Sequence, residues 1–376
     1  MATDKKAPSQ SSTSSTPYKS RLARLSADMA ARELSHLLVT SPVDVGYLTG
    51  FLGGDSYLLV GAAKPIIISD FRYQEELEAQ KSLAELVIRK ASMTEAVAEL
   101  VSASGVKSLG IQAECMTVAE RDAIAKRLGK GVVHSTTGVL SGMRRVKDQH
   151  EVALISKAIK LQEQSLLAVL PTIKPGQTEL SIAARLDAEM KSRGASGTAF
   201  GTIVAARTSG SLPHYHPGAV KTAANQSILI DWGAIYQGYR GDMTRVFTLG
   251  KWPRKIAEIY AIVLEAHEKA AAALAPGKKT GDIDKIAREH IAAAGYGDNF
   301  GHGLGHGLGL DTHEEPRMSH MLKGTILAAG NVVTIEPGIY LPGVGGVRIE
   351  DDYLVTDNGS RNLSSLPKDM EWATLS

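Results

Sequence analysis

Acidic residues stand at the ends of apolar runs, where an ionised side chain is costly. Asp231 ends the run SILID, Glu336 ends NVVTIE, and Glu350 lies within GVRIEDDYLV. Runs of Val, Ile and Leu at this density are typical of buried strands. A buried carboxylate is expensive unless a cation or several hydrogen-bond donors meet it. These residues therefore indicate a cluster that something positive must hold together.

The spacing of the acids predicts two hairpins. Ten residues separate Asp231 from Asp242, so a hairpin that turns around residues 236–238 would place the two acids directly opposite each other. Opposed residues in an antiparallel pair have Cβ atoms about 4.5 to 5.5 Å apart. Glu336 and Glu350 would belong to a second hairpin, whose odd number of intervening residues requires a bulge or a longer turn if they are to face each other.

The segment FGHGLGHGLGLDTHEEP, residues 300–316, combines three histidines with five alternating glycines. Glycine is costly to order, so such a run is expected where the backbone bends sharply or approaches something closely. No G-x-G-x-x-G register fits, and no glycine here is followed by Lys and Ser or Thr, which excludes a phosphate-binding loop. A mobile surface loop with incidental histidines remains the alternative from these residues alone.

Two kinds of partner could neutralise the acids. Arg240, Arg245 and Arg348 could form an ion-pair network with them. Alternatively, two divalent metal ions would cancel the charge of four carboxylates, and pairs of ions about 3.5 to 4 Å apart are a recurrent catalytic device. A glycine-flanked histidine beside four acids favours the metal alternative.

The elements that must position these residues predict two domains. A chain of 376 residues exceeds one ordinary core. Residues 20–143 alternate short apolar runs with helical stretches, which predicts a small α/β domain. A second domain, residues 146–376, opens with a long helix near residue 148, where Asp148 and Glu151 resemble a capping box. Its helices and strands recur in a similar order, which favours two similar halves around one site.

Composition limits the partners and the location. The net charge is +2, which gives no reason to expect nucleic acid as a partner. The single cysteine, Cys115, excludes an internal disulfide and fits a reducing compartment, so we expect a cytoplasmic protein. No run reaches the roughly 18 apolar residues of a membrane span. The polar residues 1–19 are expected to form a disordered tail.

Asp231, Asp242, His306, Glu336 and Glu350, in this order and in the contexts IDWG, GDMTR, GHGLGHGLG, TIEPGIY and VRIED, resemble the dinuclear metal pattern of the M24 metallopeptidases. The resemblance covers residues 146–376 and implies the α+β pita-bread fold with pseudo-twofold halves. Residues 20–143, with VGYLTGFLGGDSYLLV and IISDFRYQEEL, resemble the α/β N-terminal domain of the creatinase, prolidase and aminopeptidase P branch. That branch implies cleavage of the bond between an N-terminal residue and proline.

The resemblance implies a division of the metal ligands. Asp231 would hold one ion, His306 and Glu336 would hold the other, and Asp242 and Glu350 would bridge the two. One imidazole with four carboxylates is an oxygen-rich set, which favours Mn²⁺ and also accepts Co²⁺, Zn²⁺ or Fe²⁺.

Further residues are implied in catalysis and in substrate binding. Glu336 would take a proton from the attacking water and pass it to the proline nitrogen. His214 and His313 would face the substrate, and either could stabilise the tetrahedral oxyanion. His302 would lie beside the site. Arg348 would support Glu350 and Asp242 from behind, and the remaining candidates for substrate contact are Tyr340 and Arg317.

Several functions compete within the family. Methionine aminopeptidases generally lack the N-terminal domain, and creatinase lacks the metal ligands. An Xaa-Pro dipeptidase (prolidase) takes only dipeptides, whereas an aminopeptidase P takes longer peptides. The short chain and the motif HEEPR resemble compact microbial prolidases, although bacterial aminopeptidase P-like sequences are also similar, and this resemblance favours the dipeptidase. A non-catalytic peptide-binding relative would have lost ligands that this chain keeps. The expected partners are a proline-containing dipeptide or short peptide and a second copy in a homodimer, with no nucleic acid and no membrane.

Overall fold

The computed structural model describes residues 16–129, 131–322 and 324–375. The chain divides into two compact units, with the boundary between Met143 and Arg144. Helix α1 (Thr16–Ala31) begins inside the expected disordered tail, so the prediction is wrong for residues 16–19, and residues 1–15 of that tail lie outside the described residues. Among the described residues, no helix has both the length and the apolar character that a bilayer span requires.

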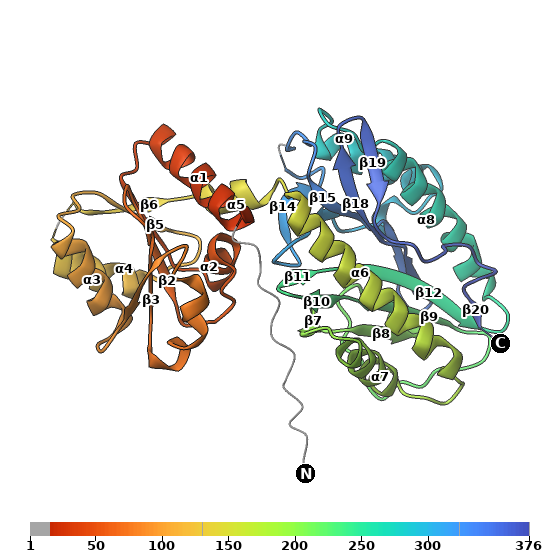
Figure 1. The fold of residues 1–376 in the computed structure, drawn as a ribbon. Coiled ribbons are helices and arrows are strands. Elements are labelled where there is room, and N and C mark those ends of the chain that lie inside the picture. The colour runs from red at the N-terminus through yellow and green to blue at the C-terminus, as the bar shows by residue number, and fades with distance from the viewer. Residues whose placement is uncertain (1–15, 130, 323, 376) are drawn as a thin grey trace, which may run out of the picture. The chain divides into compact units, whose positions relative to one another are not determined.

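The first unit is built on one mixed sheet of six strands in the order β4-β3-β2-β1-β5-β6. Its strands are β1 (His36–Val39), β2 (Tyr57–Val60), β3 (Ile66–Ser69), β4 (Glu85–Ile88), β5 (Leu109–Gln112) and β6 (Val133–Thr136). Its other helices are α2 (Pro42–Thr49), α3 (Met93–Ala103), α4 (Val118–Leu128) and α5 (Val139–Arg144). Figure 1 shows α3 and α4 on one side of this sheet and α2 on the other. Apolar side chains from both layers, such as Leu38 and Val97, form the core between the sheet and α3.

The first half of the second unit begins with two helices and continues into strands that pair antiparallel in two sheets. Its elements are α6 (Gln149–Val169), η3 (Leu170–Thr172), α7 (Glu179–Ser192), β7 (Gly197–Thr198), β8 (Ile203–Ala206), η4 (Arg207–Ser211), β9 (Ser227–Trp232), β10 (Ala234–Tyr236), β11 (Tyr239–Arg240) and β12 (Met243–Leu249). In one sheet β10 pairs with β7 and β11, and in the other β9 pairs with β8 and β12. Helix α6 begins where the sequence predicts, because Asp148 and Glu151 form a reciprocal capping box with bonds of 2.9 and 3.0 Å.

The second half repeats this order. Its elements are α8 (Arg254–Ala272), α9 (Thr280–Ala293), η5 (Gly297–Asn299), β13 (Gly305–Gly307), β14 (Glu314–Met318), β15 (Val332–Ile335), β16 (Gly338–Leu341), β17 (Gly345–Arg348), β18 (Asp351–Thr356), β19 (Gly359–Asn362) and β20 (Thr374–Leu375). Two helices again precede a sheet that carries two acids, which is the pseudo-twofold plan of the pita-bread fold. A core of buried apolar side chains joins α8 and α9 to the strands of both halves.

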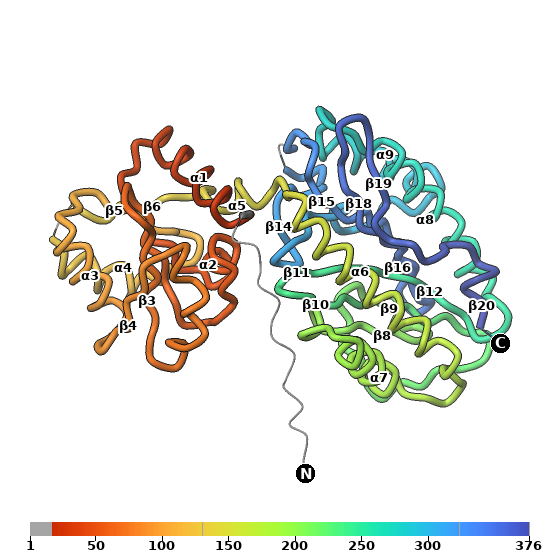
Figure 2. Tube along the Cα trace, in the orientation of Figure 1, coloured from red at the N-terminus to blue at the C-terminus, as the bar shows by residue number. Residues whose placement is uncertain are grey.

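The two acid-bearing hairpins lie side by side although about a hundred residues separate them. The backbone N–H of Glu350 donates to the carbonyl of Thr244 over 3.2 Å, which links the second hairpin to β12 of the first. Figure 2 follows this in the trace, where the blue segment around β16 and β18 runs beside the green segment around β9 and β12. This junction of the two halves is where the candidate residues meet.

Candidate metal centre

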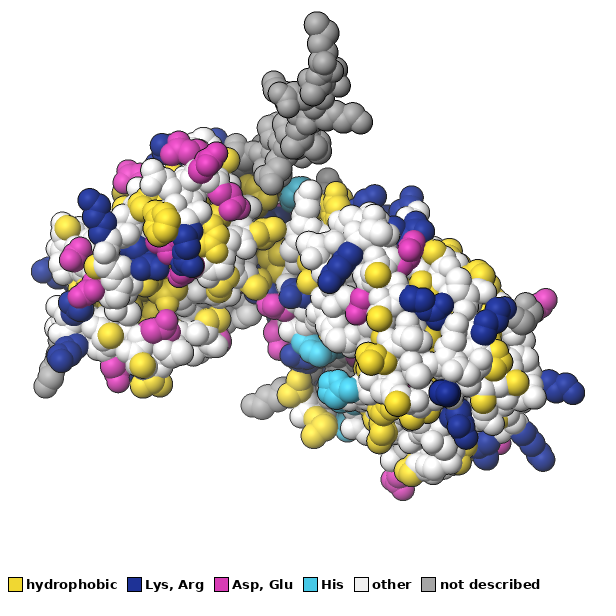
Figure 3. All heavy atoms as spheres, turned by 90° about the horizontal axis from the view of Figure 1, so that it is seen from below, with side chains coloured by type: hydrophobic (Ala, Val, Ile, Leu, Met, Phe, Trp, Pro, Cys, Tyr) yellow, Lys and Arg dark blue, Asp and Glu magenta, His cyan; other side chains and the backbone are white. Residues whose placement is uncertain are grey.

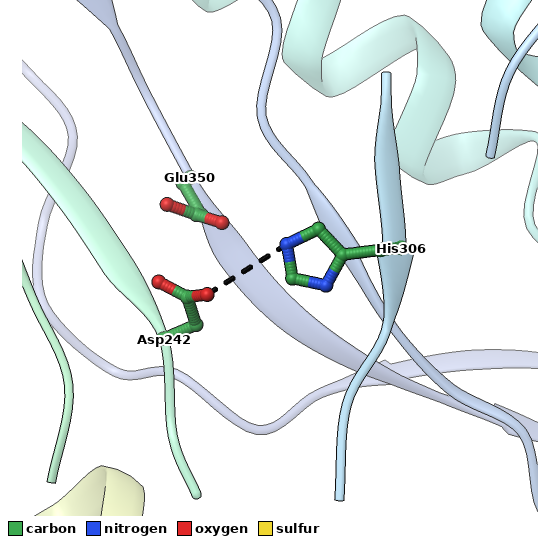
Figure 4. Close-up of side chains that lie close together, drawn as sticks. All are labelled: Asp242, His306 and Glu350. Atoms are coloured by element: carbon green, nitrogen blue, oxygen red, sulfur yellow. Dashed lines mark ion pairs between the residues drawn. The ribbon is translucent and has the colours of Figure 1, made fainter. Parts of the chain in front are cut away.

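The structure gathers three of the candidate ligands into one cluster. Ligand atoms of Asp242, His306 and Glu350 all lie within 4.8 Å of one another, and the side chains point toward a common centre in Figure 4. His306 Nε2 is 3.7 Å from Asp242 Oδ2 and 3.4 Å from Glu336 Oε1. The fifth candidate, Asp231, is buried beside this group but turns one oxygen toward Arg348.

The first hairpin differs from its expected register by two residues. Asp231 lies opposite Thr244, and the pairing continues in one register to Tyr236 and Tyr239. The turn is therefore the two residues Gln237 and Gly238, which both have positive φ, and this type suits a right-twisted hairpin. The prediction that Asp231 faces Asp242 directly is wrong. The two acids are diagonal neighbours on one face of the hairpin, at a Cα separation of about 7 to 8 Å.

The second hairpin restores the facing of its acids with a longer turn, as expected. Ile335 pairs with Asp351 and Gly338 pairs with Arg348, so the same register sets Glu336 opposite Glu350. The odd number of intervening residues is absorbed by a three-residue loop over 342–344, in which Gly343 has φ +76°.

Two of the glycines of residues 300–316, Gly305 and Gly307, serve close packing of strands rather than a sharp bend. A Cβ on Gly305 would lie 2.2 Å from the carbonyl oxygen of Thr334, and one on Gly307 would lie 2.3 Å from that of Glu315. Neither glycine has a positive φ. The close approach is therefore made to the neighbouring strands β15 and β14. His306 stands between these two glycines on β13 and projects into the cluster.

A buried ion pair from α9 clamps the backbone next to His306. Arg288 donates to the carbonyl oxygens of Phe300 and His302 at 2.7 Å each. Asp284, which is fully buried, accepts from Arg288 and from the backbone N–H of Leu304 at 2.9 Å. The mobile-loop alternative for this segment is therefore wrong, because its carbonyls and amide are tied to a helix.

Arginine does not neutralise the acidic cluster as a whole. Within the described residues, the only Lys or Arg ion pair made by Asp231, Asp242, Glu336 or Glu350 joins Arg348 Nη2 to Asp231 Oδ2 at 2.6 Å. The other two arginines have partners elsewhere: Arg245 pairs with Asp351 and Arg240 with Asp311. One guanidinium thus stands against four carboxylates.

Arg348 reaches the acids by a different route from the one expected. Its Nε donates to Thr244 Oγ1 at 2.9 Å, and that hydroxyl donates to Glu350 Oε2 at 2.7 Å. The expected support of Glu350 is therefore indirect, and Arg348 contacts Asp231 where contact with Asp242 was expected. Thr244 was missed by the sequence analysis; its signal is its position within GDMTR, which the true register sets opposite Asp231.

The electrostatics of the cluster favour a divalent cation. Burial raises the pKa of Asp242 well above its usual value, and the nearby charges of Glu350 and Asp231 add to the shift. Burial and then the charge of Asp231 raise the pKa of Glu350 to about 8. Burial lowers the pKa of His306 to about 3, so its imidazole is neutral and offers a lone pair. Asp231 Oδ1 is buried without a hydrogen-bond partner among the described residues. This donor set fits divalent metal ions.

His302 and Tyr340 extend the polar network behind Arg348. His302 Nδ1 lies 2.8 Å from the carbonyl oxygen of Gly303, which can only accept, so Nδ1 carries the proton. The bare Nε2 then accepts from the Tyr340 hydroxyl at 2.9 Å, and the phenolic oxygen accepts from Arg348 at 2.8 Å. The structure therefore gives Tyr340 a role in supporting Arg348, and it does not line the cavity beside the cluster as a substrate contact would.

A cavity of about 610 Å³ opens above the cluster. All five candidate ligands line it, together with His214, His302, His313, Arg317 and Arg348. Histidine side chains gather on one face of this unit in Figure 3. The ring of His313 lies 4.3 Å from that of His306 in an edge-to-face arrangement, and both His214 and His313 are exposed to solvent. The cavity lies in the size range of small-ligand sites.

Comparisons with known proteins identify the family. Residues 153–357 match the model of metallopeptidase family M24, and residues 21–146 match the creatinase/prolidase N-terminal domain. The Xaa-Pro dipeptidase of Pyrococcus horikoshii is 34% identical over 344 residues, which cover 91% of this chain and 96% of that protein.

Two solved structures are also similar over nearly the whole chain. The Xaa-Pro dipeptidase from Bacillus anthracis has a TM-score of 0.91 at 31% identity and covers 95% of this chain and 100% of that one. The X-Pro aminopeptidase from Thermotoga maritima has a TM-score of 0.85, also at 31% identity, and covers 94% and 99%. The family model matches more than half of the chain and the Pyrococcus horikoshii relative spans 91% of it, so the chain belongs to metallopeptidase family M24.

Proposed function

We propose that this chain is an Xaa-Pro dipeptidase that holds two divalent metal ions, preferably Mn²⁺. Asp231, Asp242, His306, Glu336 and Glu350 would hold the ions. When bound, the ions would polarise the scissile carbonyl and lower the pKa of a nearby water molecule. The buried carboxylates, which repel one another without a cation, support this assignment.

The cavity side chains supply the other steps of the proposed reaction. Glu336 lies at the edge of the cluster with its carboxylate partly exposed, so it can take a proton from water and pass it to the proline nitrogen. His214 and His313 line the cavity, and neither makes an ion pair with another described residue. Either can therefore donate a hydrogen bond to the developing oxyanion.

Arg317 is the residue that would make the enzyme prefer dipeptides to longer peptides. Its side chain lines the cavity and makes no ion pair within the described part of the chain. Its charge is felt by the histidine beside it: burial first, and then Arg317, lower the pKa of His313. In an Xaa-Pro dipeptide the proline carries a free carboxylate, whereas in a longer peptide it continues into an amide. A guanidinium in the cavity that would hold the substrate suits that carboxylate.

Three substrates test this proposal. Ala-Pro should be cleaved after Mn²⁺ loading, and Ala-Pro-NH₂ and Ala-Pro-Ala should be cleaved about 100-fold less efficiently, because the guanidinium then lacks its charged partner. Arg317→Gln should raise KM for Ala-Pro and leave Ala-Pro-NH₂ unaffected, whereas Arg361→Gln, at an exposed position outside the cavity, should change neither.

The same assay separates the alternatives. Equal cleavage of Ala-Pro and Ala-Pro-Ala would establish an aminopeptidase. This is the second candidate, because the chain has the same sequence identity, 31%, to the Thermotoga maritima aminopeptidase as to the Bacillus anthracis dipeptidase. Cleavage of no substrate by metal-loaded protein would instead favour a peptide-binding protein.

The proposal also includes a homodimer in the cytoplasm. The family resemblance supports the homodimer, and the single cysteine supports the cytoplasmic location. Light scattering measures the mass of the particle in solution.

A further inference from the structure

The segment that carries His214 is an exposed loop with few internal bonds. Residues 212–226 connect η4 to β9 and form turns and one isolated bridge, in which Thr178 pairs with Lys221. His214 is exposed on this loop, although its side chain also lines the cavity. A side chain that acts on a transition state must be placed to within a fraction of an ångström. A loop that carries such a side chain therefore has to be held in position by neighbouring helices or strands.

Glu179 provides that support from the first residue of α7. Its side chain is fully buried, and its Oε1 accepts from the backbone N–H of Ala206 on β8 at 2.8 Å. Its Oε2 accepts from the Tyr215 hydroxyl at 2.8 Å and from the backbone N–H of Gly218 at 3.2 Å. The Glu179 carboxylate thus connects α7 to strand β8 and to two residues of the loop that follow His214, Tyr215 and Gly218.

The backbone next to Glu179 reinforces this contact. The N–H of Glu179 donates to the carbonyl of Val220 at 3.0 Å, and the N–H of Leu180 donates to that of Gly218 at 3.2 Å. The loop is therefore laid along the start of α7 by four bonds. The carboxylate bonds are the strong ones, because an ionised acceptor roughly doubles the strength of a hydrogen bond.

The direction of the Tyr215 bond assigns the tyrosine to the same task. An ionised carboxylate can only accept, so the Tyr215 hydroxyl gives its hydrogen to Glu179 and has none for a substrate. Tyr215 is the immediate neighbour of His214, so a shift of its ring moves the imidazole.

We propose that Glu179 is a positioning residue that holds His214 in the cavity through Tyr215 and Gly218. The proposal rests on the proposed function, in which His214 acts on the transition state. We call the Glu179 carboxylate and its bonds to Tyr215 and Gly218 the anchor. The proposal predicts that loss of the anchor lowers kcat only because His214 is displaced.

A double-mutant cycle tests this. Glu179→Gln leaves one acceptor oxygen where two are used, and Tyr215→Phe removes only the hydroxyl. Each variant should lower kcat for Ala-Pro about tenfold with KM changed less than about twofold, because misplacing a transition-state group affects kcat. In a His214→Ala background, each should lower kcat by no more than about a further twofold, since the group that it positions is already gone. An undiminished loss in that background would overturn the proposal.

Tyr57→Phe is the matched control. Tyr57 donates to Glu120 Oε1 at 2.8 Å in the first unit, so this variant removes a bond of the same kind and length and should keep kcat at the wild-type value. Both anchor variants should keep their metal content. If Glu179→Gln does not fold, the Tyr215→Phe cycle decides alone.

Hydrogen exchange gives a readout that does not depend on activity. The amides of Gly218 and Leu180, whose hydrogen bonds join the loop to the start of α7, should exchange at least about tenfold faster in both anchor variants than in wild type, whereas Tyr57→Phe leaves them unchanged. Unchanged exchange in this loop would overturn the proposal. If wild type fails to cleave Ala-Pro, the proposed function falls, and the exchange experiment still decides whether Glu179 holds the loop.

Discussion

Arg348 Nη2 lies 2.6 Å from Asp231 Oδ2, and among the described residues this is the only ion pair that joins a Lys or Arg to the four clustered carboxylates. The same guanidinium donates to Thr244 and to Tyr340, so all three of its nitrogens are engaged. The second oxygen of Asp231, Oδ1, has no hydrogen-bond partner in the part of the chain that the structure describes. The arginine therefore orients the cluster and leaves most of its negative charge for a cation to neutralise.

Replacing Arg348 with lysine should weaken metal binding while the fold is kept. An ammonium is a single point charge and cannot reach Asp231, Thr244 and Tyr340 together. We expect Arg348→Lys to lose about 10- to 100-fold in metal affinity, as is usual for groups that orient ligating side chains. Calorimetric titration with Mn²⁺ measures this, with Arg361→Lys as the exposed control. Wild-type affinity in Arg348→Lys would contradict the orienting role.

Metal removal should destabilise the wild type, and Asp242→Ala should reverse part of that effect. A cation that binds only the native state at 100 times its Kd adds about 2.7 kcal/mol of stability. Without the cation, the buried acids repel one another, so metal-free Asp242→Ala should melt above metal-free wild type. It should also bind no more than trace Mn²⁺ and show no turnover. Melting curves with chelator and with Mn²⁺ test this, and normal activity after chelation would refute the ligand assignment.

Gly305→Ala should destabilise the second unit, whereas Gly301→Ala should not. The new Cβ at Gly305 would meet a backbone oxygen at 2.2 Å, and overpacking of this kind costs about 1 to 3 kcal/mol. At the exposed Gly301 nothing lies within 4 Å of the added carbon. Denaturant unfolding measures the difference. Equal stabilities of the two variants would show that β13 can move away from β15.

Glu314 should make the protein sensitive to acid. Burial alone would raise the pKa of Glu314, but Lys147 and Arg144 outweigh it and lower the pKa from 4.5 to about 2. A lowered folded-state pKa gives stability that is complete above about pH 4.5 and lost as the pH falls toward 2. The contribution is about 3 kcal/mol.

Glu314→Gln tests this by removing the titrating group. The stability of the variant should change less than that of wild type between pH 4.5 and 2 in denaturant melts. The control is Glu289→Gln, which removes an exposed partner 3.5 Å from Lys285 and should follow the wild-type profile, because exposed pairs contribute little. Parallel profiles for all three proteins would contradict the assignment.

Local signals in the sequence predicted much of the framework. The capping box at Asp148 sets the start of α6, because its two bonds join residues three positions apart. Acids at the ends of apolar runs marked the cluster, since an unpaired charge in a buried strand needs an explanation wherever the strand lies. Local signals are not always sufficient: the composition of DFRYQEELEAQ, residues 70–80, is typical of an α-helix, but this stretch forms the two short 3₁₀ helices η1 (Phe71–Tyr73) and η2 (Glu76–Gln80).

The register of the hairpin that carries Asp231 and Asp242 depends on the geometry of its turn, which the number of intervening residues does not give. The expected hairpin was centred one residue too early, and this displaced the expected partner of Asp231 by two positions, from Thr244 to Asp242. Only the positive φ of Gln237 beside Gly238 identifies the two-residue turn. The error did not change the face on which the acids lie, because a shift of two preserves the alternation of side chains.

The amino-acid sequence by itself determined which residues form the cluster and the family to which the chain belongs, because the types and order of these side chains carry that information. The tertiary structure alone decided which partner each side chain takes. Arg348 and Asp231 are 117 residues apart, and Glu179 and Tyr215 are 36 apart. Such pairings depend on how strands and helices pack, and neither periodicity nor capping signals extend over that distance.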